Sequence, residues 1–579
     1  MTAQVDLVVR GATVVDGTGG EPRQADVAIA DGRIAEVGAV SATGVEEIDA
    51  RGKLVTPGFV DIHTHYDGQA SWDGRLWPSS LHGVTTAVMG NCGVGFAPCR
   101  SEDHDRLIEL MEGVEDIPHA VLAEGLSWDW ESFPQFLDTL DARPHDIDFA
   151  TQVPHAALRV YVMGERGAQR QPATPQDIEA MARLAREGVA AGALGFSTSR
   201  TINHRTATGD PTPTLTAGED ELLGIAMGLR QQGAGVLQVI VDFRDPLEDV
   251  AMLRRIVERS GRPLSVSLTQ HDAKPQQYRE VLSAIAEANA AGQCIRAQVC
   301  GRPVSIVLGL EATFNPFRAH AVYKEIWQLP LAERCARLRE PELRARLLAE
   351  DVSARGGFVG SVLQHYDKMF PLTDPPDYEP TADKSVAAQA VARGISPAEH
   401  ALDLMLQDEG KGMLYVPFLN YAQGDLDASL EMLRDEHTIP GLGDGGAHLG
   451  MICDGSFPTY MLTHWTRDRT RGQRLPLPFV IKRQCADTAA ALGLHDRGLL
   501  RPGYRADLNV IDYDRLHLHA PRVIHDLPAG GRRLMQRADG YEATIVAGQL
   551  VYRDGQHTGV LPGKLVRGGQ PAPGQTLSS

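Results

Sequence analysis

The chain has 579 residues, a formal net charge of -19, 43% hydrophobic residues and 23% charged residues. This length accommodates a domain of about 200 residues or more together with a second module. The acidic balance argues against nucleic acid or an anionic membrane as a partner, because both require a basic surface.

Two further features of the composition bear on location. No segment approaches the roughly 20 unbroken apolar residues of a membrane span, and the first residues lack the basic start and apolar core of a secretory signal. Seven cysteines, scattered and odd in number, do not form a disulfide framework. We therefore expect a cytoplasmic protein.

Both ends of the chain predict short β-strands. Asp31 and Gly32 separate two β-rich runs and predict a hairpin. Neither terminal set is large enough to close a core alone. The expected strands lie at 5–10, 12–15, 27–30, 33–37, 506–511, 543–547 and 549–553.

Between these ends, apolar β-like runs alternate with amphipathic helical segments such as 175–187 and 277–288. This alternation favours an α/β fold with a parallel sheet, and eight runs favour a (β/α)8 TIM-like barrel. A doubly wound open sheet is the alternative, although no GxGxxG motif opens a helix. The runs lie at about 54–60, 84–90, 147–153, 193–197, 236–241, 264–269, 294–299 and 439–443.

The connection between the last two runs is too long for an ordinary loop, and it contains helical patterns at 331–339, 341–350 and 396–405. Insertions of this size on a barrel are usually functional. We expect the insertion, residues 313–413, to act as a lid. The alternative is a decoration that helps an oligomer to pack.

The most informative stretch is GFVDIHTH at 58–65, which follows an apolar run and carries His63 and His65. In an extended strand, residues i and i+2 project from one face, so both imidazoles can converge on one point. Imidazole pairs suit zinc and its neighbours. The simpler interpretation is a pair of solvated or hydrogen-bonded histidines at a strand end.

This stretch resembles the amidohydrolase superfamily, whose first barrel strand ends in PGFVDxHxH. Three further motifs resemble its N-acyl-D-amino-acid deacylase (D-aminoacylase) branch: GNCG at 90–93, GALGFST at 192–198 and GDGGAH at 443–448. The resemblance supports the count of eight strands. It also implies that both chain ends, 1–56 and 500–560, form a small β-sandwich beside a catalytic barrel at 57–499.

The resemblance assigns roles to residues at the ends of the runs. Cys92 matches a metal-bridging thiolate, and Asp444 matches an aspartate that binds metal and takes a proton from the nucleophilic water. Without the resemblance, Cys92 would be a buried thiol and Asp444 a turn former. With His63 and His65, these residues imply a zinc site.

The sequence departs from the branch at the fifth and sixth strands. The histidine expected after strand five is absent, and Gln238 or Asp242 stands nearby. A pair of adjacent histidines at strand six becomes Gln270 and His271, so His271 is the predicted ligand. We therefore expect one tightly bound divalent metal and a second site that is weak or absent.

Four residues at strand ends are candidates for binding the substrate. Arginine forms bidentate contacts with carboxylates, which favours Arg200 and Arg302. Lys274 follows His271, and His155 follows the third run. An ordinary surface role is the alternative for each.

The sequence thus predicts zinc-dependent hydrolysis of a non-peptide C–N bond, most simply deacylation of an N-acyl-D-amino acid or a similar small amide by a homo-oligomer. A cyclic amide, imide or aryl amide hydrolase on the same core is one alternative. A non-catalytic scaffold is another, favoured by the absent strand-five histidine.

Overall fold

The two ends of the chain meet in one nine-stranded sheet. The structure, a computed structural model, describes residues 4–352 and 362–575, so residues 353–361 of the expected insertion lie outside it. The order of the sheet is β25-β24-β23-β18-β5-β1-β2-β3, and β4 pairs with β1. Its strands are β1 (Gln4–Val14), β2 (Arg23–Ala30), β3 (Arg33–Gly38), β4 (Thr43–Asp49), β5 (Leu54–Pro57), β18 (Leu508–Ile511), β23 (Tyr541–Val546), β24 (Gln549–Arg553) and β25 (Gln556–His557).

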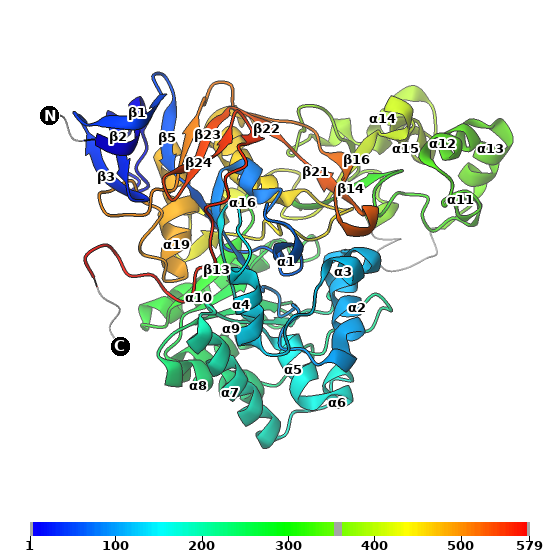
Figure 1. Cartoon of the computed structure of the whole chain (residues 1–579). Coiled ribbons are helices and arrows are strands. Elements are labelled where there is room, and N and C mark those ends of the chain that lie inside the picture. Colours follow the sequence, from blue (N-terminus) through cyan, green and yellow to red (C-terminus); the bar gives the residue numbers. More distant parts are fainter. Residues whose placement is uncertain (1–3, 353–361, 576–579) are drawn as a thin grey trace.

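The hairpin predicted at Asp31 and Gly32 is confirmed, because β2 and β3 pair antiparallel on either side of it. Both residues have positive φ angles, 52° and 71°, as tight hairpin turns require. The two chain ends share one apolar core, in which Val9 and Ile29 pack with Leu508 and Ile545. Figure 1 shows these N- and C-terminal strands together at one corner of the molecule.

The central strands form two parallel sheets and not one closed sheet. One has the order β6-β7-β8 and the other the order β17-β13-β12-β11-β10-β9. The strands are β6 (Phe59–Asp61), β7 (Val84–Met89), β8 (Asp148–Thr151), β9 (Val153–Pro154), β10 (Gly195–Arg200), β11 (Val236–Val241), β12 (Leu264–Ser267), β13 (Ile295–Val299) and β17 (Thr438–Pro440).

Backbone hydrogen bonds join the sheets at both edges. Thr64 and Gly445 form a parallel bridge after β6 and β17, and the Leu194 N–H donates to the Thr151 oxygen at 2.9 Å. The run expected at 147–153 is divided, because β8 pairs with β7 whereas β9 pairs with β10. The strands therefore follow one another in the order of a barrel.

Helices cover the outside of these strands, as Figure 1 shows for α7, α8 and α9. The helices predicted at 175–187 and 277–288 are confirmed and extend further, as α7 (Pro175–Ala191) and α10 (Gln277–Ala290). A capping box between Thr174 and Asp177 begins α7. The other helices of this part of the chain are α1 (Gln69–Trp72), α2 (His104–Glu115), α3 (His119–Gly125), α4 (Phe133–Asp141), α5 (His155–Met163), α6 (Glu165–Ala168), α8 (Glu219–Gln232), α9 (Pro246–Ser260), α16 (Asp427–Arg434), α17 (Phe457–Thr463), α18 (Leu477–Lys482) and α19 (Thr488–Ala491).

The insertion forms a lobe with its own core, at the corner of Figure 1 opposite the terminal sheet. Its antiparallel sheet has the order β14-β16-β15, and Leu338, Leu347 and Leu402 are buried in its core. The helices predicted there are confirmed to within a residue at each end. The elements are β14 (Val304–Gly309), β15 (Phe370–Pro371), β16 (Met413–Leu419), α11 (Ala321–Lys324), α12 (Leu331–Arg339), α13 (Pro341–Ala349), α14 (Val386–Arg393) and α15 (Pro397–Met405).

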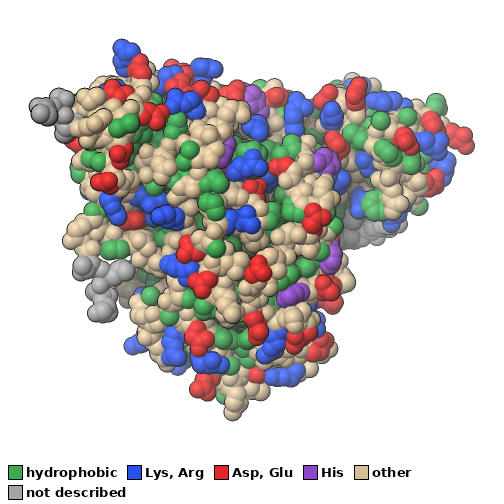
Figure 2. Space-filling model, viewed as in Figure 1, with side chains coloured by type: hydrophobic (Ala, Val, Ile, Leu, Met, Phe, Trp, Pro, Cys, Tyr) green, Lys and Arg blue, Asp and Glu red, His purple; other side chains and the backbone are tan. Residues whose placement is uncertain are grey.

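The surface carries acidic and basic side chains interspersed over the face shown in Figure 2. Exposed large hydrophobic residues are scattered, for example Val45, Leu247 and Val391. Among the helices of the described residues, none combines the length and apolar character that crossing a membrane requires.

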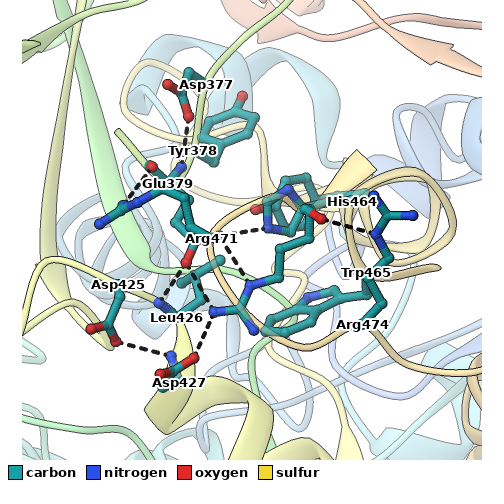
Figure 3. Close-up of polar contacts among 12 residues, drawn as sticks. Asp377, Tyr378, Glu379, Asp425, Leu426, Asp427, His464, Trp465, Arg471 and Arg474 are labelled. Atoms are coloured by element: carbon teal, nitrogen blue, oxygen red, sulfur yellow. Dashed lines mark hydrogen bonds and ion pairs between the residues drawn. The ribbon is translucent and has the colours of Figure 1, made fainter. Parts of the chain in front are cut away.

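A buried carboxylate, Glu379, ties the insertion to the loops beside it. Arg469 contacts both carboxylate oxygens, at 3.0 and 3.1 Å, and the Leu426 N–H donates at 3.0 Å. His464 Nε2 lies 3.0 Å from Glu379 Oε2, and Figure 3 shows His464 and Leu426 directed at this carboxylate. Burial would raise the pKa of Glu379, but His464 and Arg469 outweigh it and lower the pKa to about 2.

Replacing Glu379 with Gln should destabilise the protein, because it leaves the buried Arg469 guanidinium with only the exposed carboxylate of Asp427 as its countercharge. Removing one partner of such a pair typically costs about 3–5 kcal/mol. The carboxylate's pKa is depressed in the folded state, so its contribution is complete above its ordinary value of 4.5 and is lost as the pH falls toward about 2. The urea midpoints of wild type and Glu379→Gln should therefore differ most at neutral pH and converge in acid.

Glu436→Gln is the matched control, since the Glu436 side chain is 87% exposed and its loss should leave the midpoint unchanged. Equal midpoints for Glu379→Gln and wild type at pH 7 would contradict the role given to Glu379.

Candidate metal centre

The histidines at the end of β6 point to one side of the backbone. Thr64, between them, points to the other, where its hydroxyl donates to the Val88 carbonyl at 2.8 Å. His63 and His65 are both 1% exposed, and their ring centroids lie 5.4 Å apart. The alternation of a strand thus delivers two buried imidazoles to one place.

Cys92 meets these imidazoles from the loop after β7. Its Sγ lies 3.2 Å from His63 Nε2 and 3.7 Å from His65 Nε2. Its backbone has a positive φ of 57°, and its N–H donates to Gln238 Oε1 at 3.0 Å. Donor atoms of the three residues all lie within 4.8 Å of one another, so the three could hold one metal ion.

Asp444 joins the group from the loop after β17. Its Oδ1 lies 3.4 Å from His63 Nε2 and 3.6 Å from His65 Nε2. The position is fixed by the backbone, because the Asp444 N–H donates to the His63 carbonyl at 3.0 Å and the His65 N–H to the Gly445 carbonyl at 2.8 Å. The first and last strands therefore bring the carboxylate to the histidines.

Neighbouring side chains orient the two imidazoles. His63 Nδ1 lies 2.6 Å from Gln298 Oε1, whose amide nitrogen donates to Ser265 Oγ at 2.9 Å. This places the proton on Nδ1 and leaves the Nε2 lone pair facing Cys92. His65 Nδ1 lies 3.4 Å from Glu115 Oε1, a carboxylate–histidine pair typical of metal sites.

The pKa values of His63 and Asp444 suit ligands of a cation. Burial lowers the pKa of His63 to about 4, and burial raises the pKa of the Cys92 thiol to about 12. Burial opposes a charge on Asp444, but His65, His63 and His448 together hold its pKa below the usual range. His65 is buried too, yet Glu115 and Cys92 raise its pKa well above its usual value.

Three buried atoms of the centre have no hydrogen-bond partner in the described part of the chain. They are His65 Nδ1 and both carboxylate oxygens of Glu115. Buried polar atoms of this kind usually have a partner. A divalent cation among the nitrogen, sulfur and carboxylate donors of His63, His65, Cys92 and Asp444 would balance the buried negative charge. This donor set fits zinc.

For His271, the fifth predicted ligand, the structure shows neighbours other than these donors. Its backbone bridges to Lys274 and Leu419, and its charged neighbours are Asp242, Asp272 and Lys274. Within the described residues, the donors that all lie within 4.8 Å of one another are those of His63, His65 and Cys92, and neither His271 nor Asp444 meets that separation from all three.

The four candidate substrate-binding residues occupy different environments. Arg302 is 1% exposed and pairs with Asp454 at 2.6 Å. His155 is fully buried between Thr198 and Glu221, at 2.8 Å from each. Lys274 is exposed in a turn.

Arg200, at the end of β10, lines a cavity of about 310 Å³ together with Asp242, Arg244 and Asp249. Arg200 stands at the carboxyl end of its strand.

Three residues of the centre were not predicted from the sequence. Glu115 ends helix α2 and lies 3.5 Å from His448 Nε2, a contact with no local signal. Burial lowers the pKa of His204 to about 3, and the charges of His448, His65 and Asp444 also act on this imidazole. His448 could have been found, since it ends the GDGGAH motif.

Comparison with known proteins agrees with this geometry. A model of the amidohydrolase family matches residues 46–552. An N-acyl-D-aspartate deacylase and a D-aminoacylase of Alcaligenes xylosoxydans xylosoxydans are 28% and 27% identical, over 99% and 96% of this chain and 97% and 96% of their own.

A solved D-aminoacylase structure superposes with a TM-score of 0.66 at 25% identity, over 97% of this chain and 100% of its own. That protein is described as having a binuclear metal centre, with activation by one metal and attenuation by the second.

Replacing Cys92 with Ala should remove metal from the purified protein, because the donors that remain hold a dication less tightly without the thiolate. Zinc per chain after dialysis, measured by mass spectrometry, should fall well below that of wild type. Cys99→Ala is the matched control, since Cys99 is also buried and only contacts a backbone carbonyl. Undiminished zinc in Cys92→Ala would mean that this thiol serves packing alone.

Proposed function

Because this chain belongs to the amidohydrolase family, we propose that it is a metal-dependent hydrolase of small non-peptide amides, with N-acyl-D-amino acids as its substrate class. The convergence of His63, His65, Cys92 and Asp444 carries the proposal. The deacylases to which the chain is similar over almost its whole length support the substrate class.

One tightly bound zinc ion would be held by His63, His65, Cys92 and Asp444. When bound, such an ion acts as a Lewis acid, polarising a carbonyl and lowering the pKa of water toward about 7. Neighbouring residues hold the proposed ligands in position. Gln298 hydrogen-bonds to His63, and Glu115 faces His65.

Asp444 is the proposed general base and acid. Its carboxylate stays ionised in the buried centre, held so by His65 and His63, and is therefore able to accept a proton from the attacking water. It then returns that proton to the departing nitrogen, which an amide requires because the nitrogen otherwise has to leave as a strongly basic amide anion. His448, within the same loop, pairs with Glu115 and keeps that loop against the centre.

A second metal site would be weak or absent. The Gln238 side-chain oxygen already accepts the Cys92 N–H, and Asp242 accepts the Ile202 N–H at 3.1 Å. His271 stands with Asp242 and Asp272. These hydrogen bonds engage Gln238 and Asp242, which supports a second site that is weak or absent.

Arg200 is the proposed partner of the substrate carboxylate. It lies at the carboxyl end of β10, the side on which barrels bind substrates, and it faces a cavity. Arg302 and His155 are enclosed by partners of their own, so we assign them to the support of the fold. Lys274, the fourth residue predicted to bind the substrate, is exposed beside His271.

The domain division is likewise a proposal. The two parallel sheets, joined at Thr64–Gly445 and Leu194–Thr151, would act as one (β/α)8 barrel at 57–499, and the terminal strands at 1–56 and 500–560 as a β-sandwich domain. Residues 313–413 would form a lid. Supporting this, Asp116 accepts the Thr313 hydroxyl and the Gly450 N–H, which connects the insertion to the loop of Asp444.

We also propose a homo-oligomer that takes a small amide as its substrate and engages no nucleic acid. The formal net charge of -19 supports the last point.

A substrate screen tests the activity. N-acyl-D-amino acids should be hydrolysed at least tenfold faster, by kcat/KM, than their L counterparts, hydantoins or anilides. Faster turnover of hydantoins or anilides would redirect the proposal to the cyclic or aryl amide class. Zinc-loaded protein that hydrolyses none of them would favour the non-catalytic scaffold.

Replacing Asp444 with Asn tests the mechanism. Asn tolerates the left-handed backbone of this position, where φ is 45°, and offers a metal the same oxygen, but it accepts no proton at neutral pH. The variant should keep most of its zinc and lose roughly 10²–10⁴-fold in kcat.

Asp31→Asn is the matched control, because Asp31 is exposed and has a similar φ of 52°. If zinc and activity fall together in Asp444→Asn and added zinc restores the rate, Asp444 is chiefly a ligand. Near-wild-type kcat with zinc retained would refute the assignment.

A further inference from the structure

A second histidine pair with the same spacing lies on β19 (His517–Leu518) and the residue that follows it. His517 and His519 have ring centroids 4.9 Å apart at an interplanar angle of 77°. His517 pairs through its backbone with Asp539 of β22 (Ala538–Asp539). The strand geometry therefore places both imidazoles on one face, as it does at the catalytic centre.

Asp374 of the insertion completes a group with these histidines. Ligand atoms of Asp374, His517 and His519 all lie within 4.8 Å of one another. The Ala520 N–H donates to Asp374 Oδ1 at 3.1 Å, which holds the carboxylate beside the strand. Two segments that are 146 positions apart in the chain thus contribute to one cluster.

The two nitrogens of His519 have different surroundings. Nε2 lies 2.9 Å from Asp539 Oδ2, a hydrogen-bond distance. Nδ1 lies 3.8 Å from Asp374 Oδ1, too far for a hydrogen bond. Ligands of a tetrahedral zinc ion with bonds of ~2.0–2.1 Å are separated by ~3.3 Å, so a small side-chain rotation suffices for both atoms to bind one ion.

Asp374, His517 and His519 have the composition of a metal site. Asp539 is an outer carboxylate, which means that it contacts a ligand, His519, and not the metal. Asp539 would accept the Nε2 proton of His519 and leave the Nδ1 lone pair free for a metal, the role that carboxylates play behind metal-bound histidines. The side chains of His519 and Asp374 are 37% and 47% exposed, so an ion and the water that completes its coordination have access.

We propose that Asp374, His517 and His519 form a second divalent-metal site, oriented by Asp539, whose preferred ion is zinc. It shares no residue with the catalytic centre and does not depend on the proposed activity.

The site joins the insertion to the C-terminal segment that carries β19, β20 (Arg522–His525), β21 (Arg532–Met535) and β22. The same junction contains an apolar contact, in which Leu372 of the insertion packs with Val523 and Leu534, and an ion pair between Asp408 and Arg522 at 3.6 Å. A bound zinc ion would clamp these two segments together, so its effect would be on the stability of the insertion.

The test compares zinc binding by wild type and the double variant His517→Ala/His519→Ala. By isothermal titration and by metal analysis after dialysis against micromolar zinc, wild type should bind one more equivalent per chain than the double variant. The matched control is His525→Ala, an exposed histidine of β20 that contacts only a backbone carbonyl; it should bind as wild type does. Equal stoichiometry in wild type and the double variant would overturn the proposal.

Asp539→Asn addresses the outer carboxylate and leaves all three ligands in place. Its zinc affinity at this site should fall by about 10–100-fold, the usual effect of losing such a partner.

Zinc should also slow proteolysis within the insertion of wild type and not of the double variant. Identical proteolysis with and without zinc in both proteins would refute the clamp. Amide hydrolysis is measured in parallel, and loss of the extra zinc with activity retained separates this site from the catalytic one.

Discussion

The pairing of the first and last parallel strands is the constraint on which the centre depends. Thr64 and Gly445 form a parallel bridge, and the Asp444 N–H donates to the His63 carbonyl. These backbone contacts place the side chains of His63, His65 and Asp444 within a few ångströms of one another. Attraction between the side chains is not needed to bring them together. A metal centre built in this way is preorganised, because backbone hydrogen bonds at the strand ends fix the loops that carry the ligands.

The same contacts force charged groups out of water. Glu115 is 1% exposed, and its carboxylate reaches only His65 and His448 within the described residues. Isolated buried charges are costly, and they persist where a counter-ion or a function compensates for them. Glu379 differs from Glu115 in the number of its partners. That carboxylate has Arg469, His464 and a backbone N–H as partners, so it is a satisfied ion pair that holds the architecture together.

The insertion is attached to the rest of the protein at several separate points. Glu379 contacts the loops at Leu426 and Arg469, Thr313 contacts Asp116, and Asp374 contacts the C-terminal segment at Ala520. Its own core is separate from that of the barrel strands. These contacts determine how the lobe meets the loop that carries Asp444.

The sequence alone determined the strand and helix segments, the hairpin at Asp31, the terminal strands and the pairing of His63 with His65, because periodicity and turn chemistry are local properties. The motifs also pointed to Cys92 and Asp444. Only the tertiary structure decided that Glu115 lies beside His65, that His271 bridges to Leu419, and that Arg302 and His155 are enclosed. These outcomes depend on which side chains meet across elements distant in the chain, and no local pattern encodes such a meeting.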